Sequence, residues 1–285
     1  MPGDLHNHTT FSDGSCKAEM LPHLAAAVGL GWVAITDHDS MAGVRYCYKY
    51  PELYGVRLMP GLELSGYDYA RGRRVHILCY WPRADHGPLI EHCRTMARRR
   101  WEAVSRSMDL LEERCPQFRR KDALAFAADS EGQLFKSHVM RAMMEYGLAA
   151  EVYGADYKRL FKKHEEGGIA FSPAYEDCRS LLRLARESGG VAVLAHPSGY
   201  HSLELAGELA AEGLLDGIEI DHPRNTAEDR AVLEALAARH DLIVTGGTDF
   251  HGINRKVCLP VGSGQASDEM IGRINALAAE RKSKP

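Results

Sequence analysis

Two histidines near the start of the chain have the spacing of a metal-binding pair. His6 and His8 lie one residue apart in a short extended segment. Side chains two positions apart on a strand point to the same side, so both imidazoles can bind one ion. Asp13 follows on a Ser-Asp-Gly turn, within reach of the pair. We therefore expect the rest of the chain to bring further ligands to these three residues.

Further candidate ligands accompany short apolar runs that indicate strands. Besides the opening segment, strands are expected at 32–36, 56–64, 74–81, 190–195, 217–220 and 242–245. Helices are expected at 17–28, 41–53, 177–187, 203–212, 227–239 and 268–280. Parallel strands joined by helices have their carboxyl ends on one face, where residues distant in sequence meet. The candidate metal ligands gathered there are His6, His8, Asp13, His38, Glu63, His76, His196, Asp249 and His251.

Nine ligands exceed what one ion can take. At roughly four protein ligands per ion, with a carboxylate able to bridge, the set predicts two or three divalent ions. His76 or Glu63 taken alone is more often a satisfied core residue. The joint pattern favours metal binding, because charged groups are rarely buried without partners. Histidines outside the pattern are expected at the surface: His23, His86, His92, His164, His201 and His240.

The pattern changes between residues 87 and 167. This stretch has no strand-like run, and its apolar residues recur every three or four positions. Helices are expected at 89–113, 119–128, 134–146 and 150–164. The chain would thus consist of a barrel, residues 1–86 and 168–285, and a helical insertion, residues 87–167, that caps the substrate.

Composition limits the kind of partner. A net charge of −4 argues against a dedicated binder of duplex DNA or of a membrane surface. The seven cysteines include no CxxC pair, which favours reduced thiols in a cytoplasmic protein over a disulfide framework. No apolar run reaches the roughly 18 residues that a membrane span needs. We therefore expect a cytoplasmic protein, and the net charge does not argue against a small anionic substrate held by local arginines.

Six short motifs resemble those of the polymerase and histidinol phosphatase (PHP) family. They are His-Asn-His-Thr-x-x-Ser-Asp-Gly, Ile-Thr-Asp-His-Asp, Gly-Leu-Glu-Leu-Ser, Val-His-Ile-Leu, Ala-His-Pro and Thr-Asp-Phe-His-Gly. The resemblance covers residues 4 to about 260 outside the insertion. It is greatest to the branch with nucleoside 3′,5′-bisphosphate phosphatases and 5′→3′ RNA exonucleases, which the helical insertion also resembles.

The resemblance implies an α/β fold, a distorted (β/α)7 barrel, and a trinuclear site for manganese, zinc or iron. By motif, the first ion would be held by His6, His8, Glu63 and Asp249. The second would be held by His76 and His196, with Glu63 shared as a bridge. The third would be held by Asp13, His38 and His251. Many relatives of the histidinol phosphatase type have His where this chain has Asp13. That difference favours the nucleotide-type branch.

The activity expected from these features is hydrolysis of a phosphate monoester by a hydroxide that bridges two ions. Glu63 and Asp249 would serve catalysis through the metals. His222, after the strand at 217–220, would protonate the leaving oxygen or orient the phosphate, with a structural role as the alternative. The substrate would be a nucleoside 3′,5′-bisphosphate, a mononucleotide or the 5′ end of short single-stranded RNA.

Phosphate also needs cations from the protein. Arg100, Lys136 and His138 match the basic positions of the family's insertion, although relatives tend to have Arg where this chain has Lys136. His222 would be a further phosphate contact. Trp101 or Tyr200 could stack on a base.

Other functions remain open at this point. A histidinol-phosphate or sugar-phosphate phosphatase would use the same barrel. An amidohydrolase usually needs a bridging lysine, and the strand ends carry none. A non-catalytic metal or nucleotide sensor would have lost ligands, yet all nine are present.

Overall fold

The computed structural model describes residues 1–161 and 168–283. Within them, seven strands form a continuous path in the order β1-β2-β4-β5-β7-β8-β9. Their bounds are Gly3–Asp4 (β1), Trp32–Ile35 (β2), Val56–Asp68 (β4), Arg73–Tyr80 (β5), Val191–Leu194 (β7), Gly217–Asp221 (β8) and Ile243–Gly246 (β9). The short strands β3 (Glu52–Leu53) and β6 (Glu176–Asp177) pair with β4.

Backbone hydrogen bonds join the first strand of the path to the last and nearly close the barrel. The amide of Leu5 donates to the carbonyl of Gly246 at 3.1 Å, and the amide of His8 donates to that of Phe250 at 2.8 Å. The chain segment that carries His6 and His8 therefore runs beside the segment after β9. The predicted α/β barrel of seven strands is confirmed.

Strand β5 runs antiparallel to both of its neighbours, β4 and β7. The expectation that all strands of the barrel are parallel is therefore wrong. The four-residue connection between β4 and β5 makes them a hairpin, since parallel strands need a long crossover. His76 pairs in register with Ser65, two residues beyond Glu63. Glu63 and His76 thus reach the shared face from strand interiors, not from carboxyl ends.

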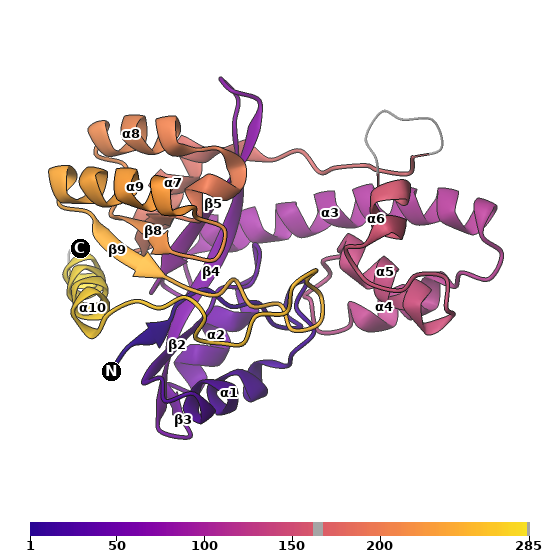
Figure 1. Ribbon diagram of the computed structural model, residues 1–285, viewed down its shortest axis with the longest axis horizontal. Coiled ribbons are helices and arrows are strands. Elements are labelled where there is room, and N and C mark those ends of the chain that lie inside the picture. The colour runs from indigo at the N-terminus through magenta and orange to yellow at the C-terminus, as the bar shows by residue number, and fades with distance from the viewer. Residues whose placement is uncertain (162–167, 284–285) are drawn as a thin grey trace.

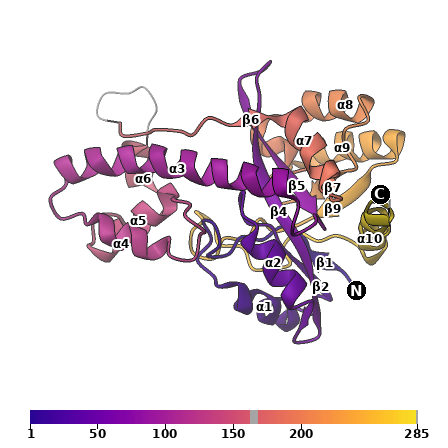
Figure 2. The same cartoon turned by 180° about the vertical axis from the view of Figure 1, so that it is seen from behind.

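Helices cover the outside of the sheet (Figures 1 and 2). They are α1 (Leu21–Ala27), α2 (Ala42–Lys49), α7 (Cys178–Glu187), α8 (Leu203–Ala211), α9 (Ala227–His240) and α10 (Asp268–Ser283), with short 3₁₀ turns at Ala18–Met20 and Pro197–Tyr200. The predicted helix at 41–53 stops at Lys49, because Pro51 cannot continue it. Leu62 and Ile77 of the sheet pack on Leu181 of α7 in the main core. Among the described residues, no helix could cross a membrane.

The segment that follows β5 is helical and extends away from the barrel (Figure 1). It contains α3 (Gly87–Arg114), α4 (Arg120–Phe126), α5 (Lys136–Glu145) and α6 (Ala155–Leu160). Met108 of α3 and Met140 of α5 belong to a core of its own, while Leu89 of α3 packs in the barrel core. Three of the four predicted helices here are confirmed. The fourth, at 150–164, starts later, at Ala155, and its last three positions lie outside the described residues, as does His164.

The side chain of Asp4 links the first strand of the barrel to the segment that follows the last strand. Its buried carboxylate accepts hydrogen bonds from the amides of Thr248 (3.0 Å) and Gly262 (2.7 Å) and from the side chain of Asn7 (3.0 Å). Burial raises the pKa of Asp4 above its ordinary value, and the hydrogen bonds from Thr248 and Gly262 oppose that rise.

Replacing Asp4 with Ala should lower the free energy of unfolding by about 3 kcal/mol, because several buried donors lose their acceptor. Urea unfolding of the metal-free protein measures this change. Asp268→Ala, at a side chain that is 71% exposed, is the control and should change stability by less than about 0.5 kcal/mol. An equal effect of the two variants would contradict the role of Asp4.

Candidate metal centre

Glu63 lies at the middle of the site. It is fully buried, and imidazoles approach both of its carboxylate oxygens. Oε1 is 2.8 Å from Nδ1 of His76 and 3.0 Å from Nε2 of His196. Oε2 is 3.0 Å from Nδ1 of His38 and 3.2 Å from Nε2 of His8. Because the two oxygens face different histidines, this carboxylate has the arrangement of a bridge between ions.

Asp249 lies beside the N-terminal histidine pair. Its Oδ1 is 3.2 Å from Nε2 of His8 and 3.7 Å from Nε2 of His6. Asp249 has a left-handed backbone, with φ +55°, and so does the buried His196, with φ +31°. Such conformations cost free energy in residues other than glycine and concentrate at functional sites. Here both strained residues turn their side chains towards the cluster.

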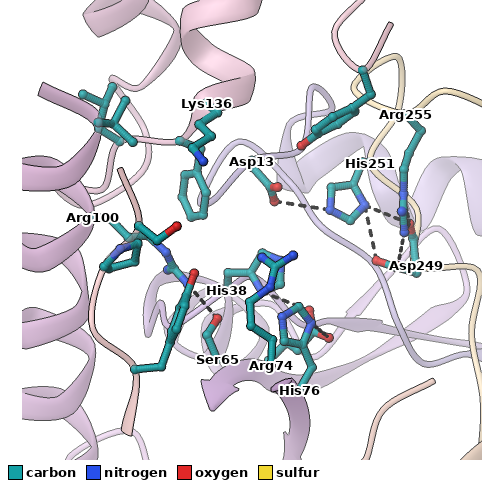
Figure 3. Close-up of a pocket in the computed structure, with 18 of the residues that line it drawn as sticks. Asp13, His38, Ser65, Arg74, His76, Arg100, Lys136, Asp249, His251 and Arg255 are labelled. Carbon is teal, nitrogen blue, oxygen red and sulfur yellow. Dashed lines mark hydrogen bonds and ion pairs between the residues drawn. The ribbon is translucent and has the colours of Figure 1, made fainter. Parts of the chain in front are cut away.

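A third group contains Asp13. Ligating atoms of Asp13, His8, His38 and His251 lie within 4.8 Å of one another. Oδ1 of Asp13 is 3.3 Å from Nε2 of His251. A dashed line in Figure 3 marks this ion pair. The structure thus brings all nine predicted ligands together. His8 lies between the first and third sets that the resemblance implies, because its two nitrogens face different carboxylates.

The donor set fits divalent metal ions. Buried atoms without a hydrogen-bond partner include Nε2 of His6, Nε2 of His8, Nδ1 of His38 and Oε2 of Glu63. Such atoms are costly in a protein interior unless a ligand binds them. Imidazole nitrogen with carboxylate oxygen is a donor set that zinc, manganese and iron accept.

The protonation states at neutral pH suit metal binding. Burial raises the pKa of Glu63, but the surrounding histidines, His76 first, outweigh burial and hold that pKa well below its usual range. Burial lowers the pKa of His38 and of His76 to about 4, and that of His196 to about 3. The ionised carboxylate of Glu63 therefore lies beside the neutral imidazoles of His38, His76 and His196, which are the forms that bind a metal ion.

Glu219 is a site residue that the sequence reasoning missed. It is fully buried in β8, with Oε1 2.9 Å from Nδ1 of His6, and its Oε2 accepts from the amide of His196 at 2.9 Å. A carboxylate on the far nitrogen of a ligating histidine fixes the ring and its tautomer. Burial lowers the pKa of His6, but Glu219 and Glu63 raise it to about 10, so an ion that binds His6 would displace a proton from the ring. The sequence feature that could have identified Glu219 is a charged residue inside an otherwise apolar strand.

The predicted phosphate contacts have different surroundings. Arg100 is buried, and its guanidinium donates to Asp39 (2.5 Å), Ser65 (2.6 Å) and Gln133 (2.5 Å). Asp39 also lies 3.4 Å from Nε2 of His92. The expectation that His92 is at the surface is therefore wrong, because Asp39 draws the ring inward.

Two other predicted phosphate contacts, His138 and Lys136, differ in whether they line the cavity. Nε2 of His138 is 3.1 Å from the carbonyl of Ser12, and its Nδ1 accepts from the amide of Phe135, so the backbone engages both nitrogens. Lys136 lines the cavity, with Nζ 5.1 Å from the ring centroid of Phe161. Trp101 is 40% exposed and lies away from the cavity.

The ligand cluster forms one side of a cavity of about 420 Å³. Figure 3 shows Asp13, His38, His76 and His251 around it, and Lys136 also lines it. Its lining also includes cations and aromatic residues that the sequence reasoning did not select: Arg74, Arg224, Arg255, Lys256, Tyr153, Tyr157 and Tyr175. A small anionic molecule would be surrounded by metal ligands, cations and aromatic rings.

Replacing Glu219 with Gln should weaken metal affinity about tenfold to a hundredfold, because the carboxylate that orients His6 loses its charge. Metal content after dialysis against graded chelator measures this, with circular dichroism to establish folding. Glu208→Gln, at an exposed glutamate on α8 that pairs with Arg71, is the control. Unchanged metal retention in Glu219→Gln would contradict the positioning role.

The metal-free protein should lose thermal stability as the pH falls from about 6.5 towards 4. His38, His76 and His196 titrate at about 3 to 4 when folded, but near 6.5 when unfolded. In this window the unfolded state binds more protons, so acid favours unfolding. The raised pKa of His6 stabilises the folded state by an amount that is already complete below pH 6.5, so it does not change the trend in this window. A melting temperature that is constant across this window would contradict the burial of neutral imidazoles.

Comparison with known proteins identifies the family. The PHP domain model matches residues 4–185. A phosphoribosyl 1,2-cyclic phosphate 1,2-diphosphodiesterase of Eggerthella lenta is 37% identical over 250 residues, 87% of this chain and 94% of that protein. The 5′-3′ exoribonuclease Rnm of Escherichia coli is 29% identical over 273 residues, 91% of this chain and 90% of its own length. A solved structure from Bifidobacterium adolescentis, described as a metal-dependent phosphoesterase, has a TM-score of 0.86 at 27% identity, with 96% of each chain covered. The chain therefore belongs to the PHP domain family and is a metal-dependent phosphoesterase.

Proposed function

We propose that this protein hydrolyses a phosphate ester of a small ribose phosphate, using two to three divalent ions of manganese, zinc or iron. The observation that carries the proposal is the cavity of about 420 Å³, with the ligand cluster on one side and cations around its wall. A cavity of this size accepts a sugar phosphate or one nucleotide. For an RNA chain, only the terminal nucleotide would enter.

The first candidate substrate is a ribose cyclic phosphate diester that carries a 5-phosphate. It rests on the Eggerthella lenta relative, whose name gives phosphoribosyl 1,2-cyclic phosphate and which this chain matches over 94% of its length. The second candidate is the monoester of a nucleoside bisphosphate, a mononucleotide or a short RNA. It rests on the exoribonuclease relative and on Asp13. Both classes place a phosphate on a ribose.

The metal ligands of the proposal are the nine clustered residues, with Glu63 as the bridge. When bound, the ions supply an activated water and offset charge on the phosphate oxygens. The carboxylates of Glu63 and Asp249 would supply negative charge to such ions. Asp13 and His251, 3.3 Å apart, complete the side of the cluster that faces the cavity.

His222 is suited to orienting the phosphate. The amide of Arg224 donates to its Nδ1 at 3.0 Å, which leaves the proton of the neutral ring on Nε2. That nitrogen is buried, lacks a hydrogen-bond partner and lies 3.7 Å from Oδ2 of Asp249. Burial lowers the pKa of His222 to about 4, so at neutral pH the ring is neutral and its Nε2–H is available to a phosphate oxygen. We propose this role in place of a general acid.

The helical segment from α3 to α6 is proposed to cap the substrate. Its residues Lys136, Tyr153 and Tyr157 line the same cavity as the metal ligands. Lys136 is the proposed phosphate contact of this segment. Arg100 and His138 hold the wall in place through Asp39 and the backbone of Ser12.

A substrate panel tests the proposal. Protein loaded with Mn²⁺ should release phosphate or open the ring of 5-phosphoribosyl 1,2-cyclic phosphate with the highest kcat/KM. The comparison substrates are a nucleoside 3′,5′-bisphosphate, a mononucleotide, histidinol phosphate and short 5′-phosphorylated RNA. Preference for the bisphosphate or the RNA would select the second candidate. No turnover of any phosphoester at full metal loading would refute the proposal.

Replacing Asp249 with Asn should reduce both metal content and turnover, the latter at least about a hundredfold, because a charged ligand is lost. Asn tolerates the left-handed backbone at this position, so the fold should survive, which circular dichroism checks. Asp241→Asn, also at a left-handed but exposed position, is the matched control. Wild-type metal stoichiometry in Asp249→Asn would remove Asp249 from the ligand set.

A further inference from the structure

Arg74 extends from the same face of β5 as the proposed metal ligand His76. The two residues are two positions apart on one strand, so their side chains point to the same side, about 7 Å apart along the strand. Figure 3 shows the Arg74 side chain directed into the cavity beside His76 and His38. Its neighbour Arg73 points to the opposite face and donates to the carbonyl of His201 at 2.8 Å.

The partners of Arg74 are neutral. Its guanidinium carbon lies 5.2 Å from the centroid of the Tyr200 ring, and Tyr175 lines the same part of the cavity. The hydroxyl of Tyr200 is in turn 3.4 Å from Nε2 of His76. Among the residues that the structure describes, no carboxylate forms an ion pair with Arg74.

Other arginines of the cavity differ in this respect. Arg100 is paired with Asp39, and Arg255 contacts the carboxylate of Asp249. A guanidinium that is directed into a cavity and lacks an acidic partner suits an anion supplied by the ligand, and its planar fork fits phosphate. The stacking on Tyr200 holds the group in place, so less side-chain entropy is lost when the anion binds.

We infer that Arg74 binds a second anionic group of the substrate, a phosphate that is not hydrolysed. This inference rests on the proposed function, because it takes the ester at the metal cluster as the reacting one. Tyr200 contacts both the Arg74 guanidinium and the ring of His76, so a phosphate bound by Arg74 would lie beside the ester at the metal cluster. Arg74 thereby makes the second phosphate a requirement for efficient turnover, and ribose phosphates with two anionic groups become the substrate class.

A matched pair of substrates tests the inference: 5-phosphoribosyl 1,2-cyclic phosphate and ribose 1,2-cyclic phosphate, which lacks the 5-phosphate. If the wild type prefers nucleotides, the pair is a nucleoside 3′,5′-bisphosphate and the same nucleoside with only the hydrolysed phosphate. The wild type should favour the member with two anionic groups by roughly tenfold to a hundredfold in kcat/KM, the effect of one charged hydrogen-bonding partner. Arg74→Met should abolish most of this preference, chiefly through KM, and Arg74→Lys should restore part of it.

Arg73→Met is the matched control, because it removes a charge from the adjacent position on the other face of the strand. It should keep the wild-type preference. An Arg74→Met variant that loses activity equally on both substrates, or that loses bound metal, would show that Arg74 acts only through His76 and would overturn the inference. A wild type that turns over both substrates equally would overturn it too, while leaving the proposed function intact. A wild type that turns over neither would refute the proposed function, and this inference with it.

Discussion

The attraction between one buried carboxylate and the imidazoles around it is the constraint on which the rest of this molecule depends. Glu63 has no exposed surface, and a lone carboxylate in such a place would be protonated or excluded. Backbone hydrogen bonds hold it on both sides, from its amide to the carbonyl of Asp37 at 3.2 Å and from the amide of Asp39 to its carbonyl at 3.0 Å. The barrel brings five histidines to it from separate strands and loops, and the same convergence produces a site for cations.

Much of this site could be predicted from local rules. Side-chain alternation places His6 and His8 on one side of a strand, and the carboxyl end of β9 leads directly to Asp249 and His251. The structure places His76 beside Glu63, as the sequence predicted, although the direction of its strand was predicted wrongly. The motif places the residue on the shared face whichever way the strand runs.

The residues that escaped prediction depend on contacts across the barrel. Glu219 is one charge in an apolar strand, and only the structure shows that His6 lies against it. Arg100 belongs to a basic run on a helix, and this pattern predicts a phosphate contact. In the structure its guanidinium is instead paired with the buried Asp39. Arg74 carries no motif of its own, and its importance comes from the absence of an acid nearby in the described residues. Patterns of neighbouring residues in the sequence do not show which distant residues come into contact.

The antiparallel hairpin of β4 and β5 has a consequence for how the protein folds. It joins Glu63 to His76, and Arg74 beside it, through a four-residue turn, whereas His6 meets Asp249 only when opposite ends of the chain come together. Closing a short loop costs less entropy, so local pairings form sooner than distant ones. We therefore expect the centre to be built in two stages, with the hairpin half assembled before the barrel closes. An ion that binds early would find a half-built set of ligands, and closure of the barrel would complete its coordination.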